Sequence, residues 1–281
     1  MWDALQLEFI RNALTAGVLV SVVCGVIGTL VVVNRIVFLA GGIAHAAYGG
    51  IGLSFFMGWP YAVGTTGFSI LSAGVMAAVT LKARHRVDAM VGVIWAVGMA
   101  IGVILLDLTP GYNVDLMSYL FGSILAVPAS DLWQMAAIGI FVIAVVAYYY
   151  NDFLAMSYDD EFARLRNIPI TFLYCLLLGM VALTVVMIIR VVGLILVIAL
   201  LTIPPFIAEK FTGSLRAMMV LSSVLSGLFT ITGLWLSYLF DLTSGATIIL
   251  VAAAGFFASV LWRHFKPRRP ADPPDETVNP A

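Results

Sequence analysis

One histidine, His45, stands in an apolar stretch built otherwise from glycine, alanine and larger hydrophobic residues, FLAGGIAHAAYGGIG at residues 38–52. On a helix, Gly41, His45 and Gly49 recur every four residues and share one face, which Gly52 continues. Two interpretations remain open. The face packs closely against a neighbouring helix, or it lines a pore in which the imidazole is a metal ligand or a proton carrier.

A carboxylate, Glu209, follows the segment TIPPFIA at residues 202–208. Pro204 and Pro205 in this segment predict a break or a kink in the helix. A carboxylate just after such a break would be placed to assist a divalent cation as it leaves a pore. The default interpretation is an ordinary charge at a helix end beside Lys210.

Other acidic residues lie near the ends of apolar segments. Asp115 opens DLMSYLFG, where it either complements a helix N-terminus or lines an outer vestibule of the pathway. Asp131 begins a later apolar run, where a solvated carboxylate at the helix end is the default expectation. The apolar centre of residues 110–130 is too short to cross a bilayer and predicts an interfacial or re-entrant helix.

The segment SYDDEFARLRNIPI at residues 157–170 mixes three consecutive acids with two arginines and ends at a proline. This pattern predicts a short amphipathic helix that presents Phe162 and Leu165 to a cytosolic partner. Glu161, Arg164 and Arg166 would provide the charges around that contact. The alternative is an ordinary charged loop, but the length of the connection favours docking.

The elements that must hold these residues are membrane helices. The chain has 281 residues, of which 62% are hydrophobic and only 10% charged, so it lacks the charged surface of a soluble domain. Apolar runs long enough to span a bilayer recur along it. We predict an all-α polytopic membrane protein with eight or nine transmembrane helices. The expected spans are residues 10–33, 36–58, 61–81, 89–106, 131–150, 170–189, 191–208, 217–239 and 246–264.

Charge sets the expected orientation and excludes one class of partner. Basic clusters at residues 82–86, 161–166 and 263–269 predict cytoplasmic loops, which places the N-terminus outside and Arg190 in a tight outer turn. Residues 1–265 form the predicted transmembrane domain, and residues 266–281 a disordered cytoplasmic tail. The net charge of −1 offers no basic surface for nucleic acid. The apolar spans predict that membrane lipid surrounds the chain.

Four segments together indicate a family: NRIVFLAGGIAHAAYGGIGLSFFMG, DAMVGVIWAVGMAIGVILL, VDLMSYLFGSILAV and VGLILVIALLTIPPFIAEKFTGSLRAMM. In this order they resemble the integral-membrane permease of ABC importers for zinc, manganese or iron(II), the ABC-3 family. Members of this family commonly carry an aspartate four residues before a histidine on the metal route. Here His45 fills the histidine position, whereas Gly41 stands where the aspartate is usual.

The resemblance implies a fold, a location and partners. It implies a permease bundle in a bacterial or archaeal cell membrane, a homodimeric or paired transmembrane unit, separate cytosolic ATPases and an extracytoplasmic metal-binding protein. The segment SYDDEFARLRNIP is similar to the coupling loop that contacts the ATPase in this family. The sequence holds no Walker A motif, which agrees with a non-enzymatic subunit. No cofactor would be bound permanently, because the metal would be cargo.

Three alternatives remain open from the sequence. The first is a permease of similar architecture for a metal chelate such as a siderophore, haem or cobalamin, which would need no imidazole. The second is an ion-coupled secondary transporter with His45 in a proton relay, although such proteins often show two related halves. The third is a membrane anchor or assembly subunit that transports nothing.

Overall fold

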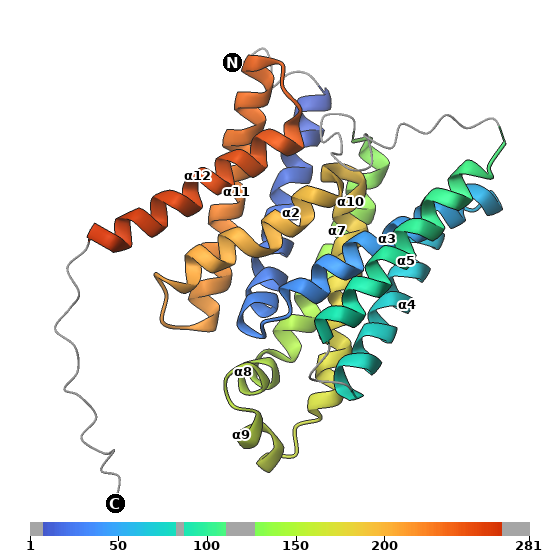
Figure 1. Ribbon diagram of the computed structural model, residues 1–281. Coiled ribbons are helices and arrows are strands. Elements are labelled where there is room, and N and C mark those ends of the chain that lie inside the picture. Colours follow the sequence, from blue (N-terminus) through green and yellow to red (C-terminus); the bar gives the residue numbers. More distant parts are fainter. Residues whose placement is uncertain (1–7, 83–86, 111–126, 266–281) are drawn as a thin grey trace, which may run out of the picture.

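The computed structural model describes residues 8–82, 87–110 and 127–265, and its regular structure is entirely helical (Figure 1). Among these residues, nine helical segments are long and apolar enough to cross a membrane, as the sequence predicted. The predicted interfacial helix around Asp115 and the predicted tail at residues 266–281 lie outside the described residues. The helices are α2 (Glu8–Val33), α3 (Val37–Met57), α4 (Tyr61–Lys82), α5 (Val87–Asp107), α7 (Ala129–Tyr148), α8 (Tyr150–Tyr158), α9 (Asp160–Leu165), α10 (Ile170–Glu209), α11 (Leu215–Phe240) and α12 (Ser244–Phe265).

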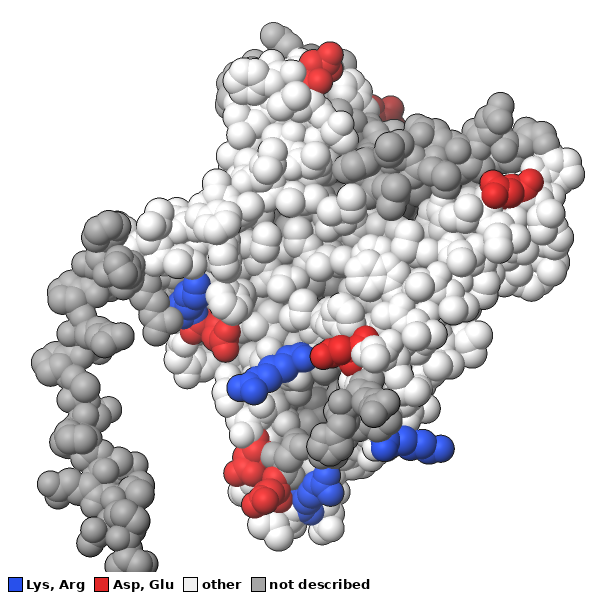
Figure 2. Space-filling view, viewed as in Figure 1, with Lys and Arg blue, Asp and Glu red and all other residues white. Residues whose placement is uncertain are grey.

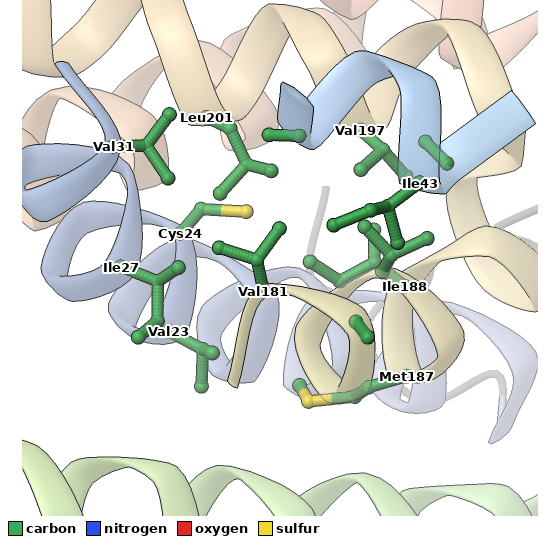
Figure 3. Packing of buried hydrophobic residues seen from close by; sticks show 14 of the residues in the cluster. Val23, Cys24, Ile27, Val31, Ile43, Val181, Met187, Ile188, Val197 and Leu201 are labelled. Atoms are coloured by element: carbon green, nitrogen blue, oxygen red, sulfur yellow. The ribbon is translucent and has the colours of Figure 1, made fainter. Parts of the chain in front are cut away.

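Two groups of helices meet at the centre of the bundle. α3 packs against α5 and α4, and these three lie side by side in Figure 1. α2 packs against α11 and α10, while α10 also contacts α3, α4, α7 and α12. Figure 3 shows the apolar core between α2 and α10, where Cys24 and Ile27 face Val181 and Leu201 and where Ile43 enters from α3. α10 therefore joins the two groups.

The helix α10 contains two membrane-length halves, Ile170–Ile189 and Val192–Glu209. Its backbone leaves helical geometry at Gly193, with φ of 78° and ψ of 167°, a conformation that glycine adopts far more readily than other residues. The tight turn predicted near Arg190 therefore corresponds to a kink at Gly193, where the two halves of α10 meet. In Figure 1 the two halves run in different directions from this point.

Of the break or kink predicted at Pro204 and Pro205, the break is wrong, and the kink stays a prediction. α10 continues through both prolines to Glu209. Proline at position 205 leaves the Leu201 carbonyl without its usual intrahelical donor. That carbonyl faces α2 at Gly28, where an added Cβ atom would lie 2.6 Å from the oxygen. The close approach of a glycine covers the freed carbonyl, which explains how the helix tolerates the proline.

The glycines of α3 make its close contacts with α4 and α5. A Cβ atom on Gly49 would lie less than 3 Å from the Phe68 ring, and one on Gly52 would overlap the backbone of Gly102. These two positions are therefore in direct helix contact, which supports the packing interpretation of the glycine face. Gly41 differs, because an added Cβ would make only an ordinary contact of 3.6 Å with Ile198.

This difference yields a matched pair of variants. Gly52→Ala is expected to lower the stability of the purified permease by about 1–3 kcal/mol, because the methyl group must displace the backbone of α5. Gly41→Ala should be neutral or slightly stabilising, because alanine is the better helix former and space is present. Thermal unfolding in detergent measures both. Equal melting temperatures for the two variants would contradict the assignment of Gly52 to a backbone contact.

Candidate functional site

His45 lies in the middle of α3, and its side chain is the only one between Leu39 and Gly52 that is not fully buried. Its Nδ1 atom lies 2.9 Å from the carbonyl oxygen of Gly41 one turn earlier. Because a carbonyl oxygen only accepts hydrogen bonds, Nδ1 carries the proton, and the lone pair of the neutral ring is on Nε2. Histidines that bind metals commonly donate their other nitrogen to such a carbonyl.

A tryptophan of α5 holds the plane of this imidazole. The rings of His45 and Trp95 stack with centroids 3.8 Å apart and an interplanar angle of 26°. The indole is fixed in turn, because Trp95 Nε1 donates to Met99 Sδ at 3.1 Å and because Phe38 lies against the indole with centroids 6.2 Å apart. The imidazole is thus oriented by one hydrogen bond and one aromatic stack.

Trp95 is the site residue that sequence reasoning missed. Its signal in the sequence was its place near the centre of an apolar run, since tryptophans of membrane helices gather at the two interfaces. An indole at mid-span needs a partner for its N–H group, which Met99 supplies here.

A cavity of about 660 Å³, called here the α3–α10 cavity, brings two of the predicted site residues together. Gly41 and Glu209 both line it, and Trp95 and Arg35 line it with them. His45 contacts two of these lining residues, Gly41 through its hydrogen bond and Trp95 through its stack. Glu209 itself is exposed at the end of α10, and the prediction that it serves a leaving cation stays open.

Of the remaining predicted acidic residues, Asp131 does not line this cavity. Asp115 lies outside the described residues. Asp131 was expected to be solvated, but it is only 7% exposed in the first turn of α7, so that expectation is wrong. Part of its environment is the Ser130 hydroxyl, which donates to the carboxylate at 3.4 Å.

The metal-binding capacity of the described residues is small. No group of three or more histidine, cysteine, aspartate or glutamate side chains converges anywhere within them. The candidate site offers one imidazole lone pair, on His45 Nε2, and the Gly41 hydrogen bond and the Trp95 stack fix the orientation of that ring. A divalent ion there would take its other ligands from water, from backbone oxygens or from another chain, which suits brief occupancy rather than storage.

The predicted docking segment is helical, as expected. Asp159 caps α9 by accepting from the Phe162 amide at 2.9 Å, and Ala163 anchors the helix from its buried side. Phe162 is 48% exposed and Leu165 is 83% exposed, with the Arg166 guanidinium 5.7 Å from the Phe162 ring centroid. Glu161 and Arg164 are exposed beside them. Phe162 and Leu165 are therefore presented outward.

α8 and α9 project from the lower end of the bundle (Figure 1). The basic side chains visible in Figure 2 lie from the middle of the molecule downward, toward the end that holds these two helices. A broad uncharged surface lies above them, of the kind that faces lipid. This distribution agrees with the predicted cytoplasmic location of the segment.

The bundle, its nine candidate spans and its projecting α8–α9 segment define a multi-pass membrane permease. The sequence profile of the ABC 3 transport family matches residues 6–263, and the chain belongs to this family. ATP hydrolysis in ABC systems is carried by a separate subunit. As a permease of an ABC importer, the chain works with ATP-hydrolysing subunits and a substrate-binding protein, which excludes the ion-coupled secondary transporter.

Relatives of known sequence match almost the whole chain. An uncharacterised membrane protein of Synechocystis, slr2045, is 49% identical over 94% of each chain. The manganese transport system membrane protein MntC of Listeria monocytogenes is 35% identical over 92% of each chain. The manganese import system permease protein ScaB of Streptococcus gordonii is 30% identical over 90% of each chain.

Solved structures agree with this assignment. PsaBC from Streptococcus pneumoniae, determined in complex with a Fab, superposes with a TM-score of 0.83 at 29% identity, covering 92% of this chain and 93% of that one. An inward-facing metal-chelate type ABC transporter superposes with a TM-score of 0.71 at 15% identity, covering 92% and 88% of the two chains. This second likeness shows the fold alone.

Proposed function

We propose that the cargo of this permease is a free divalent transition metal ion, with manganese favoured over zinc and iron(II). The observation that carries the proposal is the geometry of His45, whose Nδ1 is occupied by the Gly41 carbonyl so that Nε2 is available to a metal. Relatives named as manganese transport proteins match this chain over at least nine-tenths of its length, which supports manganese.

The proposed site would bind the metal ion weakly. Imidazole suits manganese, iron and zinc, and one imidazole per chain holds any of them briefly. A site with a full set of protein ligands would retain the ion rather than release it. With Gly41 in the place where the family commonly has aspartate, the second ligand is water, a backbone oxygen or the His45 of a second permease chain in a homodimer. No permanently bound cofactor belongs to this mechanism.

ATP hydrolysis by the partner subunits would drive transport by moving the α8–α9 segment. Phe162 and Leu165 present apolar surface, and Glu161, Arg164 and Arg166 surround it with both signs of charge, as a docking contact requires. Closure of the ATPase pair on ATP would move this segment and switch access between the two sides. The extracytoplasmic metal-binding protein would deliver the ion to the opposite face.

The cargo assignment is tested by His45→Gln, which keeps the size and polarity of the side chain but removes the imidazole. We expect manganese uptake by cells that express the full transporter to fall at least tenfold, with permease abundance and ATPase association unchanged. Gly74→Ala is the control, because this position of α4 has no neighbouring atom within 4 Å of an added Cβ. Normal uptake by the glutamine variant would reduce His45 to a packing residue.

The docking assignment is tested by charge reversal in α9. The double variant Glu161→Lys/Arg164→Glu is expected to weaken co-purification of the ATPase several-fold, because both charges of the contact are inverted. Glu8→Lys, an exposed change at the start of α2, is the control. If the variant complex stayed whole and its ATP hydrolysis remained stimulated by substrate, ATPase docking would lie elsewhere on the permease.

A further inference from the structure

Arg35 lies in the turn just after α2, in a backbone conformation that disfavours arginine. Its φ is 57°, in the left-handed region, and its amide donates to the Val32 carbonyl at 3.0 Å. The next amide, of Ile36, donates to the Val31 carbonyl at 3.0 Å. Together these bonds form a Schellman motif, whose left-handed position is usually glycine because a Cβ atom costs free energy there.

Other left-handed positions of the described chain obey the usual preference. They are occupied by Gly58, Asn167 and Asp241, residue types that tolerate this region. Asn167 repeats the two bonds of the motif, with its amide on Arg164 and that of Ile168 on Ala163. Arginine at position 35 is therefore the exception, and a strained residue that persists calls for a functional reason.

The surroundings of Arg35 supply such a reason. It lines the α3–α10 cavity together with Glu209, and the same pair lines a second cavity of about 260 Å³ beside Ser157 and Tyr158. A third cavity, of about 570 Å³, has Arg35 and Asp88 in its lining. A fixed positive charge thus borders every one of these spaces, and in two of them its charged neighbour is Glu209.

The turn that carries Arg35 is tied to the docking segment. The Asn34 side-chain amide donates to the Ser157 hydroxyl of α8 at 2.8 Å and to the Leu30 carbonyl at 2.8 Å. A shift of α8 would therefore pull directly on the residue next to Arg35. Arg35, Glu209 and the start of the docking segment at Ser157 and Tyr158 all line the 260 Å³ cavity.

We propose that Arg35 regulates metal release by keeping Glu209 a weak cation site at the cytoplasmic mouth of the pathway. This inference rests on the proposed function, because it assumes a divalent cargo. A guanidinium that borders the same cavities as the carboxylate repels a divalent ion there, to a degree that falls with distance and ionic strength. Arg35 acts through Glu209 and is a positioning residue, not a ligand.

The test uses Arg35→Gly, which removes the guanidinium while supplying the residue that the left-handed backbone prefers. We expect the melting temperature of the purified transporter complex to be unchanged or higher. Manganese titration followed by electron paramagnetic resonance should show binding at least threefold tighter than in the parent. The maximal rate of manganese uptake should fall at least threefold, and Arg35→Lys should recover most of it.

Glu209→Gln separates the proposed route from other effects of the charge. In this background, Arg35→Gly should change neither manganese binding nor the uptake rate, because the carboxylate through which Arg35 acts is gone. Asp241→Gly is the control for the backbone, since it relaxes another left-handed position, at the end of α11, that lines none of the three cavities and lies outside the docking segment. It should behave as the parent does.

Three outcomes would overturn the inference: unchanged binding and uptake in Arg35→Gly, the same change in the Glu209→Gln background, or a lower melting temperature accompanied by loss of uptake. The last outcome would show that Arg35 is structural. Failure of the proposed function looks different. In that case the parent transporter takes up no manganese, or His45→Gln leaves uptake intact, whatever the Arg35 variants do.

Discussion

The backbone contact between α3 and α5 is the constraint on which the site depends. Gly98 of α5 lies so close to Ala46 that an added Cβ atom would be 2.7 Å from its Cα, and Gly102 is equally close to Tyr48. In lipid no hydrophobic force draws two helices together, so such approaches fix their register through dispersion contacts and shape. With that register, Trp95 falls one turn before Gly98 and lies on His45. The stack that orients the imidazole is therefore a consequence of glycine packing several residues away.

The second feature is the bend in α10 together with the charged residues Glu209 and Arg35 that line the α3–α10 cavity. Gly193 redirects α10 so that its second half runs past Gly41 and ends at Glu209, which gives the α3–α10 cavity a wall and an acidic rim. Gly28 lets α2 cover the Leu201 carbonyl, which has no intrahelical donor because of Pro205. The second half of α10 therefore stays helical to its end. Arg35 and Asn34, at the close of α2, then bring a positive charge and a link to α8 to the same place.

Features that are local in the sequence were predictable, and features that depend on long-range packing were not. Membrane spans follow from length and apolarity, so their ends were predicted to within a few residues. The exposed face of α9 followed from the pattern around Phe162. The partner of His45 did not, because nothing near residue 45 encodes which residue of α5 faces it. Nor did the helical path through Pro205, since the glycine that permits it lies on α2.

The central claim is that the permease moves a bare divalent ion past a single imidazole per chain. Its most direct test is ATP-driven accumulation of radioactive manganese in liposomes that contain the complete transporter with its ATPase and binding protein. The metal is offered either free or bound to an excess of a strong chelator. The structure predicts accumulation of the free ion, dependent on ATP, and none of the chelate. Accumulation of the chelate with exclusion of the free ion would contradict it.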